Sequence, residues 1–274
     1  MLIDYHLHNR FSPDSESTSA QIAARAIERG IKEICITNHG ETFAKGGGRE
    51  VFTVKEALGR FEECHKEIGE TQKKFPGLPI RFGAEIEYVE GWMPKLKKFV
   101  DALPFDFLIG SHHIVDGVVI SSHHFAEDLF SRASEKEAYT HYFDGLLKMV
   151  EWGHFDVVGH FDINKKYGHK FYGPFQPQKY KPHITAILQA MKKKGIGMEL
   201  NANCLRDKCK ELFPNPDILK WCLDIGIENY TLGSDSHEWQ DTGLNIAEAL
   251  QIAKDAGIPT ISTYIKRKPT KHSI

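Results

Sequence analysis

Short apolar runs rich in β-forming residues alternate with longer helical stretches along the whole chain. The runs cover residues 2–6, 33–37, 80–85, 105–111, 155–159, 196–200, 229–233 and 260–265. Apolar strands separated by helices predict βαβ units and therefore a parallel sheet. Seven or eight such units in a chain of 274 residues favour a barrel. An open, doubly wound sheet is the alternative, but no G-x-G-x-x-G motif follows the first run.

Helices are predicted between these runs. One begins after Thr18, where Gln21 three residues on completes a capping box, and it ends before Gly30. The others cover residues 54–75, 135–152, 182–194, 216–224 and 244–256. Two segments interrupt the pattern, residues 40–50 with a triple glycine and residues 161–183, which are rich in Lys, Tyr, Gly and Pro. Long irregular segments in compact domains are often lids or binding loops, and a surface loop is the alternative.

The composition is that of a globular protein, and residues 1–274 are expected to form one domain. Hydrophobic residues make up 41% of the chain, charged residues 26%, and the formal net charge is -2. Without clustered positive charge, nucleic acid is not an expected partner. Five cysteines without a C-x-x-C pair argue against a disulfide framework and a cysteine zinc site. No basic leader or long apolar run is present, so no membrane span is expected and a cytoplasmic location is predicted.

Potential metal ligands gather at the ends of the apolar runs. Fifteen histidines are present, and six of the first seven runs finish with a histidine or an acidic residue. These residues are His6 and His8, His39, Glu85, His112 and His113, His160, and Asp235 and His237. In a parallel barrel the carboxyl ends of all strands converge on one face, where active sites are built. Scattered surface histidines would not share this position.

The spacing within the motifs supports a metal site. Residues i and i+2 of an extended segment point the same way, which pairs His6 with His8 and Asp235 with His237. Adjacent His112 and His113 are expected to point apart, so that only one of them is a ligand. Each motif alone is compatible with ordinary strand or turn residues. Imidazole nitrogens mixed with carboxylate oxygens suit zinc, iron or manganese better than magnesium or calcium.

These motifs resemble those of the polymerase and histidinol phosphatase (PHP) superfamily, whose fold is a distorted (βα)7 TIM-like barrel. The resemblance spans residues 6–237 and rests on H-x-H, a histidine after the second run, G-x-E, S-x-H, G-H-x-D and G-S-D-x-H. It selects His113 over His112 and adds Asp14. The ligand set that it implies is His6, His8, Glu85 and Asp235 for one metal, Glu85, His113 and His160 for a second, and Asp14, His39 and His237 for a third.

The resemblance implies phosphate ester hydrolysis assisted by two or three divalent ions of zinc, iron or manganese. Such ions lower the pKa of bound water and neutralise the phosphoryl oxygens. We expect in-line attack of a metal-bound hydroxide on phosphorus, with Glu85, Asp235 and His237 at the catalytic centre. The acid that protonates the leaving group is left open between Asp162, His112 and metal-bound water.

The segment from Glu199 to Arg206 reads E-x-N-x-x-x-x-R and resembles that of histidinol-phosphate phosphatases of histidine biosynthesis. A small-molecule phosphate monoester, L-histidinol phosphate, is therefore the expected substrate. The Arg206 guanidinium is suited to binding phosphate in a bidentate manner, although a surface arginine balancing Asp207 and Glu211 is the alternative. The further residues expected near the cationic substrate are His112, Glu87, Glu199 and Asp162.

Three other functions compete with this interpretation. One is a phosphatase or phosphodiesterase acting on nucleotides or other small phosphates. Another is a metal-binding regulatory module or a polymerase-type proofreading domain without catalysis, against which the full ligand set and the absence of a polymerase-length extension argue. A metal-dependent amidohydrolase usually needs a bridging lysine at a strand end, and none is suitably placed.

Overall fold

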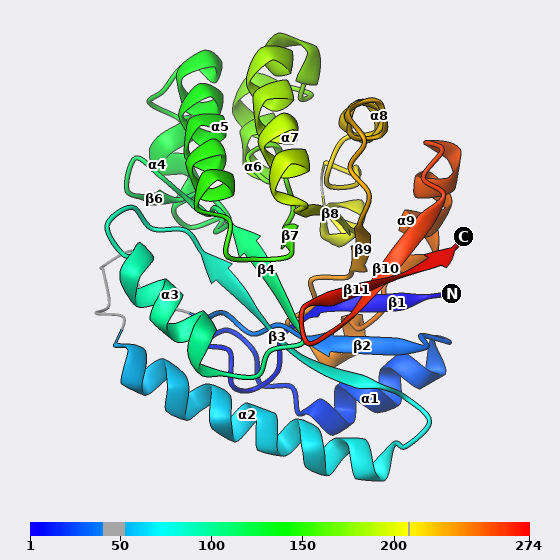
Figure 1. Ribbon diagram of the computed structural model, residues 1–274. Helices are drawn as coiled ribbons and strands as arrows, with labels where there is room; N and C mark the ends of the chain where they lie inside the picture. The colour runs from blue at the N-terminus through cyan, green and yellow to red at the C-terminus, as the bar shows by residue number, and fades with distance from the viewer. Residues whose placement is uncertain (41–52, 208) are drawn as a thin grey trace.

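The computed structural model describes residues 1–40, 53–207 and 209–274, and its centre is a nearly closed barrel of seven parallel strands (Figure 1). The strand order is β1-β2-β3-β4-β7-β8-β9. Their bounds are Ile3–Leu7, Glu33–Ile36, Ile80–Glu87, Phe107–Ser111, Val157–Val158, Gly197–Asn201 and Tyr230–Gly233. Each of the first seven predicted runs overlaps one of these strands, so the predicted barrel is confirmed.

The barrel almost closes between its first and last strands. All six neighbouring pairs in the sheet are parallel, whereas β1 and the segment after β9 share only an isolated bridge between Leu7 and Ser236 among the described residues. Six of the seven strands are buried at every position. This pattern is expected for parallel strands that are covered by helices outside and by packed side chains inside.

Helices surround the barrel (Figure 1). The larger ones are α1 (Ser19–Glu28), α2 (Val54–Lys74), α3 (Met93–Ala102), α5 (Glu135–Trp152), α7 (Lys181–Lys194), α8 (Pro216–Ile225) and α9 (Ile246–Asp255). The predicted capping box is present at α1, where the Thr18 side chain accepts from the Gln21 backbone and the Gln21 side chain accepts from Thr18. Helix α3 was not predicted from the sequence. No helix of the described segments is long and apolar enough to cross a membrane.

The eighth apolar run does not join the barrel. It forms β10 (Thr260–Ile265), which pairs antiparallel with β11 (Lys268–Ser273). The Tyr264 ring packs on Phe107 with centroids 4.8 Å apart, and the Tyr264 backbone N–H donates to the Tyr5 hydroxyl. At the tip of the hairpin, the Arg267 guanidinium contacts Asp156, which directly precedes β7. The hairpin therefore covers the amino ends of the strands, opposite the face where the motifs end.

Residues 161–183 are largely helical, which corrects the expectation of a long irregular loop. They contain α6 (Lys165–Tyr172), the 3-10 turn η1 (Pro177–Tyr180) and the start of α7. The Tyr172 hydroxyl is hydrogen-bonded to the carbonyls of Phe130 and Ala133, which fixes the end of α6 against the short helix α4 (Ala126–Phe130). Packing of aromatic side chains thus outweighs the preference of glycine and proline for irregular loops. The triple glycine at 46–48 lies outside the described residues.

Candidate metal centre

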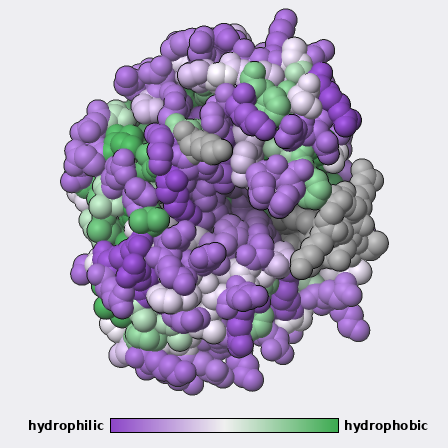
Figure 2. Space-filling view, turned by 180° about the vertical axis from the view of Figure 1, so that it is seen from behind, coloured by the Kyte–Doolittle hydropathy of each residue, from purple (hydrophilic) through white to green (hydrophobic). Residues whose placement is uncertain are grey.

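The predicted ligands converge at the carboxyl ends of the barrel strands. On the face turned away from the β10–β11 hairpin, Figure 2 shows a hollow bordered mainly by hydrophilic residues. Three sets of donor atoms here lie within 4.8 Å of one another. They belong to His8, Asp14, His39 and His237, to His6, His8 and Asp235, and to His6, Glu85 and His160. The ninth predicted ligand, His113, joins the last set, because its Nε2 lies 3.0 Å from Nε2 of His160.

The first position comprises His6, His8 and Asp235 with the Oε2 atom of Glu85. His6 Nε2 lies 3.2 Å from this oxygen and 3.7 Å from Asp235 Oδ1, and His8 Nε2 lies 3.6 and 3.8 Å from the same two atoms. Ligands about 2.0 to 2.2 Å from a tetrahedral zinc ion are roughly 3.3 to 3.6 Å apart, close to these separations. Although His8 Nε2 is buried, it has no hydrogen-bond partner among the described residues. These residues therefore fit a divalent metal ion.

The second position comprises His113 and His160 with the Oε1 atom of Glu85. This oxygen lies 2.9 Å from His160 Nε2 and 3.4 Å from His113 Nε2, and it also accepts a hydrogen bond from Ser111 Oγ at 2.6 Å. Glu85 therefore directs one carboxylate oxygen to each of the first two positions. This is the placement expected of the predicted bridging ligand.

The third position comprises Asp14, His39 and His237. Asp14 Oδ2 lies 3.3 Å from His39 Nε2 and 3.1 Å from His237 Nε2. His39 Nδ1 also lies 3.1 Å from Oε2 of Glu85, so this position adjoins the first. The Asp14 side chain is 47% exposed, whereas Glu85 is buried. The third position is therefore the one that opens toward solvent.

Burial and mutual charge set the protonation of these groups. Burial lowers the pKa of His8 well below its usual value, and the nearby His237 and His39 imidazoles lower it further. A neutral imidazole is the form that binds metal. For Glu85, burial raises the pKa, but the charges of His6 and His39 outweigh it and hold the pKa well below its usual value. Asp14 is shifted in the same direction, because His39 and His237 overcome the effect of burial on its pKa.

Glu199 and Glu87, predicted as substrate contacts, lie behind histidines of the predicted ligand set. Glu199 Oε1 lies 2.5 Å from His6 Nδ1, and Glu87 Oε2 lies 2.7 Å from His113 Nδ1. Glu87 also accepts the His113 backbone N–H at 2.9 Å. Both glutamates are almost fully buried. The structure thus gives them the place of carboxylates that orient histidine ligands, not of groups that face a substrate.

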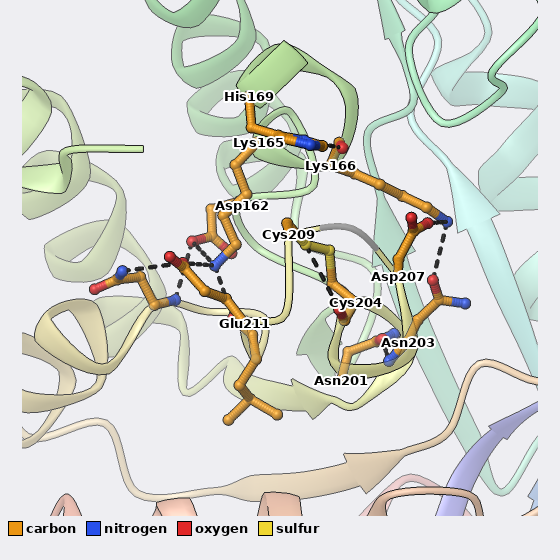
Figure 3. Close-up of a disulfide and its surroundings, with 12 residues drawn as sticks. Asp162, Lys165, Lys166, His169, Asn201, Asn203, Cys204, Asp207, Cys209 and Glu211 are labelled. Carbon is orange, nitrogen blue, oxygen red and sulfur yellow. Dashed lines mark hydrogen bonds and ion pairs between the residues drawn. A yellow bond between two sulfur atoms is a disulfide. The ribbon is translucent and has the colours of Figure 1, made fainter. Parts of the chain in front are cut away.

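Asp162, a candidate acid for the leaving group, forms a buried ion pair with Lys165 (Figure 3). Its Oδ2 accepts from Lys165 Nζ at 2.9 Å and from the Asn215 backbone N–H at 2.9 Å. Lys165 Nζ also donates to the Leu212 carbonyl at 2.7 Å and lies 3.2 Å from Glu211. These contacts are those of a residue that stabilises the fold, not of one that donates a proton to a leaving group. The sequence reading did not single out Lys165, since a buried lysine has no local sequence signal.

His112 points away from His113, as the alternation of side chains on a strand predicted. Its ring packs near Tyr142 with centroids 5.5 Å apart, and its Nε2 lies so close to Gly145 of α5 that a Cβ there would overlap it. Burial, with a smaller contribution from His113, lowers the pKa of His112 to about 3. A buried neutral imidazole facing a helix is not placed as predicted, either for substrate binding or for proton donation.

Arg206 lies against the backbone of the last ligand segment. Its Nη1 donates to the Ser234 carbonyl at 2.8 Å and its Nη2 to the Asp235 carbonyl at 3.1 Å, while Nε lies 3.6 Å from Asp241. Asp235 itself has a φ of 53°. The guanidinium thus supports a strained backbone turn at a predicted ligand, a role that neither the phosphate-fork prediction nor its surface alternative included.

Two cysteines flank Arg206 and form a disulfide (Figure 3). Cys204 and Cys209 have Cα atoms 6.0 Å apart, because the 3-10 turn η2 (Asn203–Arg206) folds the chain back on itself. The sequence argued against a disulfide framework, and one pair within a single turn does not make such a framework. The other three, Cys35, Cys64 and Cys222, are buried and free.

A cleft of about 570 Å³ adjoins the third position. Its lining includes Asp14 and His237, and also Glu16, Glu238 and Trp239. Neither Glu16 nor Glu238 forms an ion pair or side-chain hydrogen bond within the described part of the chain. These three residues were not predicted from the sequence, although each lies within two residues of a predicted ligand. Their closeness to Asp14 and His237 in the sequence could have indicated them.

Known proteins are similar to this chain in both sequence and fold. The chain is 26% identical over 272 residues to histidinol-phosphatase from Lactococcus lactis subsp. lactis, covering 98% of this chain and 97% of the relative. It is 27% identical over 267 residues to probable histidinol-phosphatase from Clostridium acetobutylicum, covering 95% and 96%. The crystal structure of the Lactococcus lactis histidinol phosphate phosphatase, complexed with zinc, L-histidinol and phosphate, superposes with a TM-score of 0.85 at 26% identity, covering 98% of this chain and 99% of that one.

The family assignment rests on the part of the chain that carries most of the strand-end motifs. The model of the PHP domain matches residues 4–203, which include His6, Glu85 and His160. The barrel continues beyond the matched residues to β9, after which Asp235 and His237 complete the predicted ligand set. The chain is a member of the PHP domain family.

Proposed function

We propose that the protein hydrolyses L-histidinol phosphate to L-histidinol and phosphate as a metal-dependent phosphomonoesterase. The observation that carries the proposal is the convergence of the nine predicted ligand side chains at one end of the barrel, in a chain that matches histidinol-phosphatases over nearly its full length. The solved relative binds zinc, L-histidinol and phosphate together, the combination that this chemistry needs.

The side chains would hold two or three divalent ions of zinc, iron or manganese. Metal ions bound here would lower the pKa of water toward neutrality and neutralise charge on the phosphoryl oxygens. Glu85 keeps its carboxylate ionised and turned to both of the first two positions. The neutral His8 imidazole presents Nε2 to the first position without a competing hydrogen bond in the described chain. Burial of these groups excludes bulk water from behind the centre, which strengthens their electrostatic effect.

The organic part of the substrate would lie in the cleft beside Asp14 and His237. The cationic part of histidinol phosphate needs carboxylates that are not already paired, and within residues 1–40, 53–207 and 209–274 those of Glu16 and Glu238 meet this condition. The indole of Trp239 adds an aromatic face, which attracts ammonium groups and stacks on imidazole rings. These residues replace Glu87, Glu199 and Asp162 as the proposed contacts for the cationic group.

The deciding experiment is phosphate release from histidinol phosphate, a nucleotide panel and phenyl phosphate, with purified protein and added zinc, manganese or iron. Histidinol phosphate is expected to have the highest kcat/KM, and a chelator should abolish turnover until metal is restored. Metal analysis of the active protein gives the identity and number of ions. Faster turnover of a nucleotide would assign the site to the broader phosphatase alternative.

The cleft has its own test. Glu16→Gln and Glu238→Gln should each lower kcat/KM for histidinol phosphate, while phenyl phosphate, which has no cationic group, should be hydrolysed as before. Each lost charge-assisted contact is worth about 1.5 to 3 kcal/mol when it is sheltered, and less at this exposed site. Glu63→Gln on α2 is the matched control. Equal losses on both substrates would show that the cleft does not recognise the cationic group.

A further inference from the structure

The carboxylate of Glu199 lies against a glycine of the neighbouring strand β9. Glu199 lies on β8 and is 1% exposed. A Cβ atom at Gly233, the last residue of β9, would overlap Oε1. The missing side chain at Gly233 therefore leaves the space that this oxygen fills.

Three donors converge on the two oxygens of Glu199. Oε1 lies 2.5 Å from His6 Nδ1, and Oε2 accepts the His160 backbone N–H at 2.6 Å and the Asn201 side-chain amide at 3.1 Å. A proton held on His6 Nδ1 leaves Nε2 free to bind a metal. The backbone contact matters as well, because His160 has a φ of 23°, a conformation that non-glycine residues rarely adopt.

The same two histidines meet Glu85 on their other side. His6 Nε2 lies 3.2 Å from Glu85 Oε2, and His160 Nε2 lies 2.9 Å from Glu85 Oε1. Glu85 therefore stands in front of one ligand from each of the first two positions, and Glu199 stands behind the same pair. A displacement of Glu199 would move a ligand of each position at once.

We propose that Glu199 is a positioning residue that couples metal binding at the first and second positions, through the His6 ring and the His160 backbone. It acts through these histidines and does not touch the substrate. The inference rests on the proposed function in that the centre holds metal, but it does not depend on which phosphate ester is hydrolysed.

The test is zinc binding to Glu199→Gln, measured by equilibrium dialysis and metal analysis. Glutamine has one acceptor oxygen, so its NH2 group must face either the His6 Nδ1–H or the His160 backbone N–H. Loss of such an orienting carboxylate usually costs roughly 10- to 100-fold in metal affinity. Both contacts are made by one side-chain group, so an amide that turns or shifts to relieve one of them displaces the other, and we expect this loss at both positions together. In Glu87→Gln, where the altered carboxylate holds the His113 ring and backbone, the second position alone should weaken, and Glu63→Gln should bind zinc like the wild type.

Wild-type zinc affinity at either position in Glu199→Gln would overturn the coupling. A second measurement needs no variant and decides the case where Glu199→Gln does not fold. Long-range proton–nitrogen NMR correlations of the zinc-loaded wild type should show His6 with a proton on Nδ1 and zinc on Nε2, and zinc on Nδ1 would refute the inference. A wild type that binds zinc in this way but does not hydrolyse histidinol phosphate would contradict the proposed substrate and leave the positioning role supported.

Discussion

Replacing Lys165 with methionine should cost about 3 to 5 kcal/mol of unfolding free energy, the usual loss when one partner of a buried ion pair is removed. The Lys165 ammonium is buried and neutralises Asp162 at 2.9 Å. Without it, the Asp162 carboxylate would keep a single donor, the Asn215 backbone N–H, among the described residues. In a protein of this size the loss corresponds to a melting temperature lowered by about 6 to 20 °C.

The measurement is urea and thermal unfolding of the metal-free protein, followed by circular dichroism, and kcat is determined separately on the metal-loaded protein well below the transition. Asp162→Asn alone should cost less than Lys165→Met, because Glu211 lies 3.2 Å from Lys165 and still balances its charge. The double variant should be more stable than Lys165→Met, since it removes both charges and leaves an acceptor for Asn215. If Asp162 were the general acid instead, Asp162→Asn would lower kcat by about 10²- to 10⁴-fold with little change in stability, and the structural role would be refuted.

Three further predictions concern the centre and its surroundings. Glu85→Ala should release metal from the first and second positions together and lower kcat by orders of magnitude, and near-normal activity at saturating metal would contradict its bridging placement. Arg206→Ala should weaken metal binding by loosening the backbone at Asp235, whereas full metal content with a KM raised roughly ten- to a hundredfold would support the phosphate fork instead. Gly145→Ala would stabilise an ordinary helix, but here the new Cβ overlaps His112, so calorimetry should show a loss of about 1 to 3 kcal/mol with kcat unchanged.

The positions of the ligands could be predicted from sequence because they depend on topology more than on detail. In a parallel barrel, a residue at the carboxyl end of any strand reaches the same face, so errors of a residue or two in strand bounds did not matter. The bounds of α5, 135–152, were also predicted correctly. There, Ser134 and Glu137 form a capping box, and Gly153 ends the helix in the left-handed conformation.

The roles of the carboxylates could not be predicted in the same way. Glu85 and Glu87 are two residues apart on β3 and point to the same side, yet Glu85 faces the metal positions and Glu87 backs His113. The two glutamates differ in how far along the barrel they lie relative to the neighbouring strand β4, and this depends on the register between β3 and β4. Glu199 likewise depends on a glycine of another strand, Gly233, which a single sequence does not align with it.

The incomplete pairing of β1 with β9 gives the metal centre a part in holding the barrel shut. At this seam the Asp235 backbone N–H donates to the His6 carbonyl at 2.9 Å, and that of His8 donates to the Ser236 carbonyl at 3.0 Å. An ion held by His6 and Asp235 would cross-link two positions that are 229 residues apart in the sequence. Bringing the two ends of this long segment together costs conformational entropy, although the cost grows only slowly with the length of the segment. A metal ion bound to both ends would offset part of that cost. Removing the metal should therefore open the barrel at this seam before its other strands separate. Amide hydrogen exchange at His8 and Asp235 should then speed up more than exchange at the amides that join the other barrel strands.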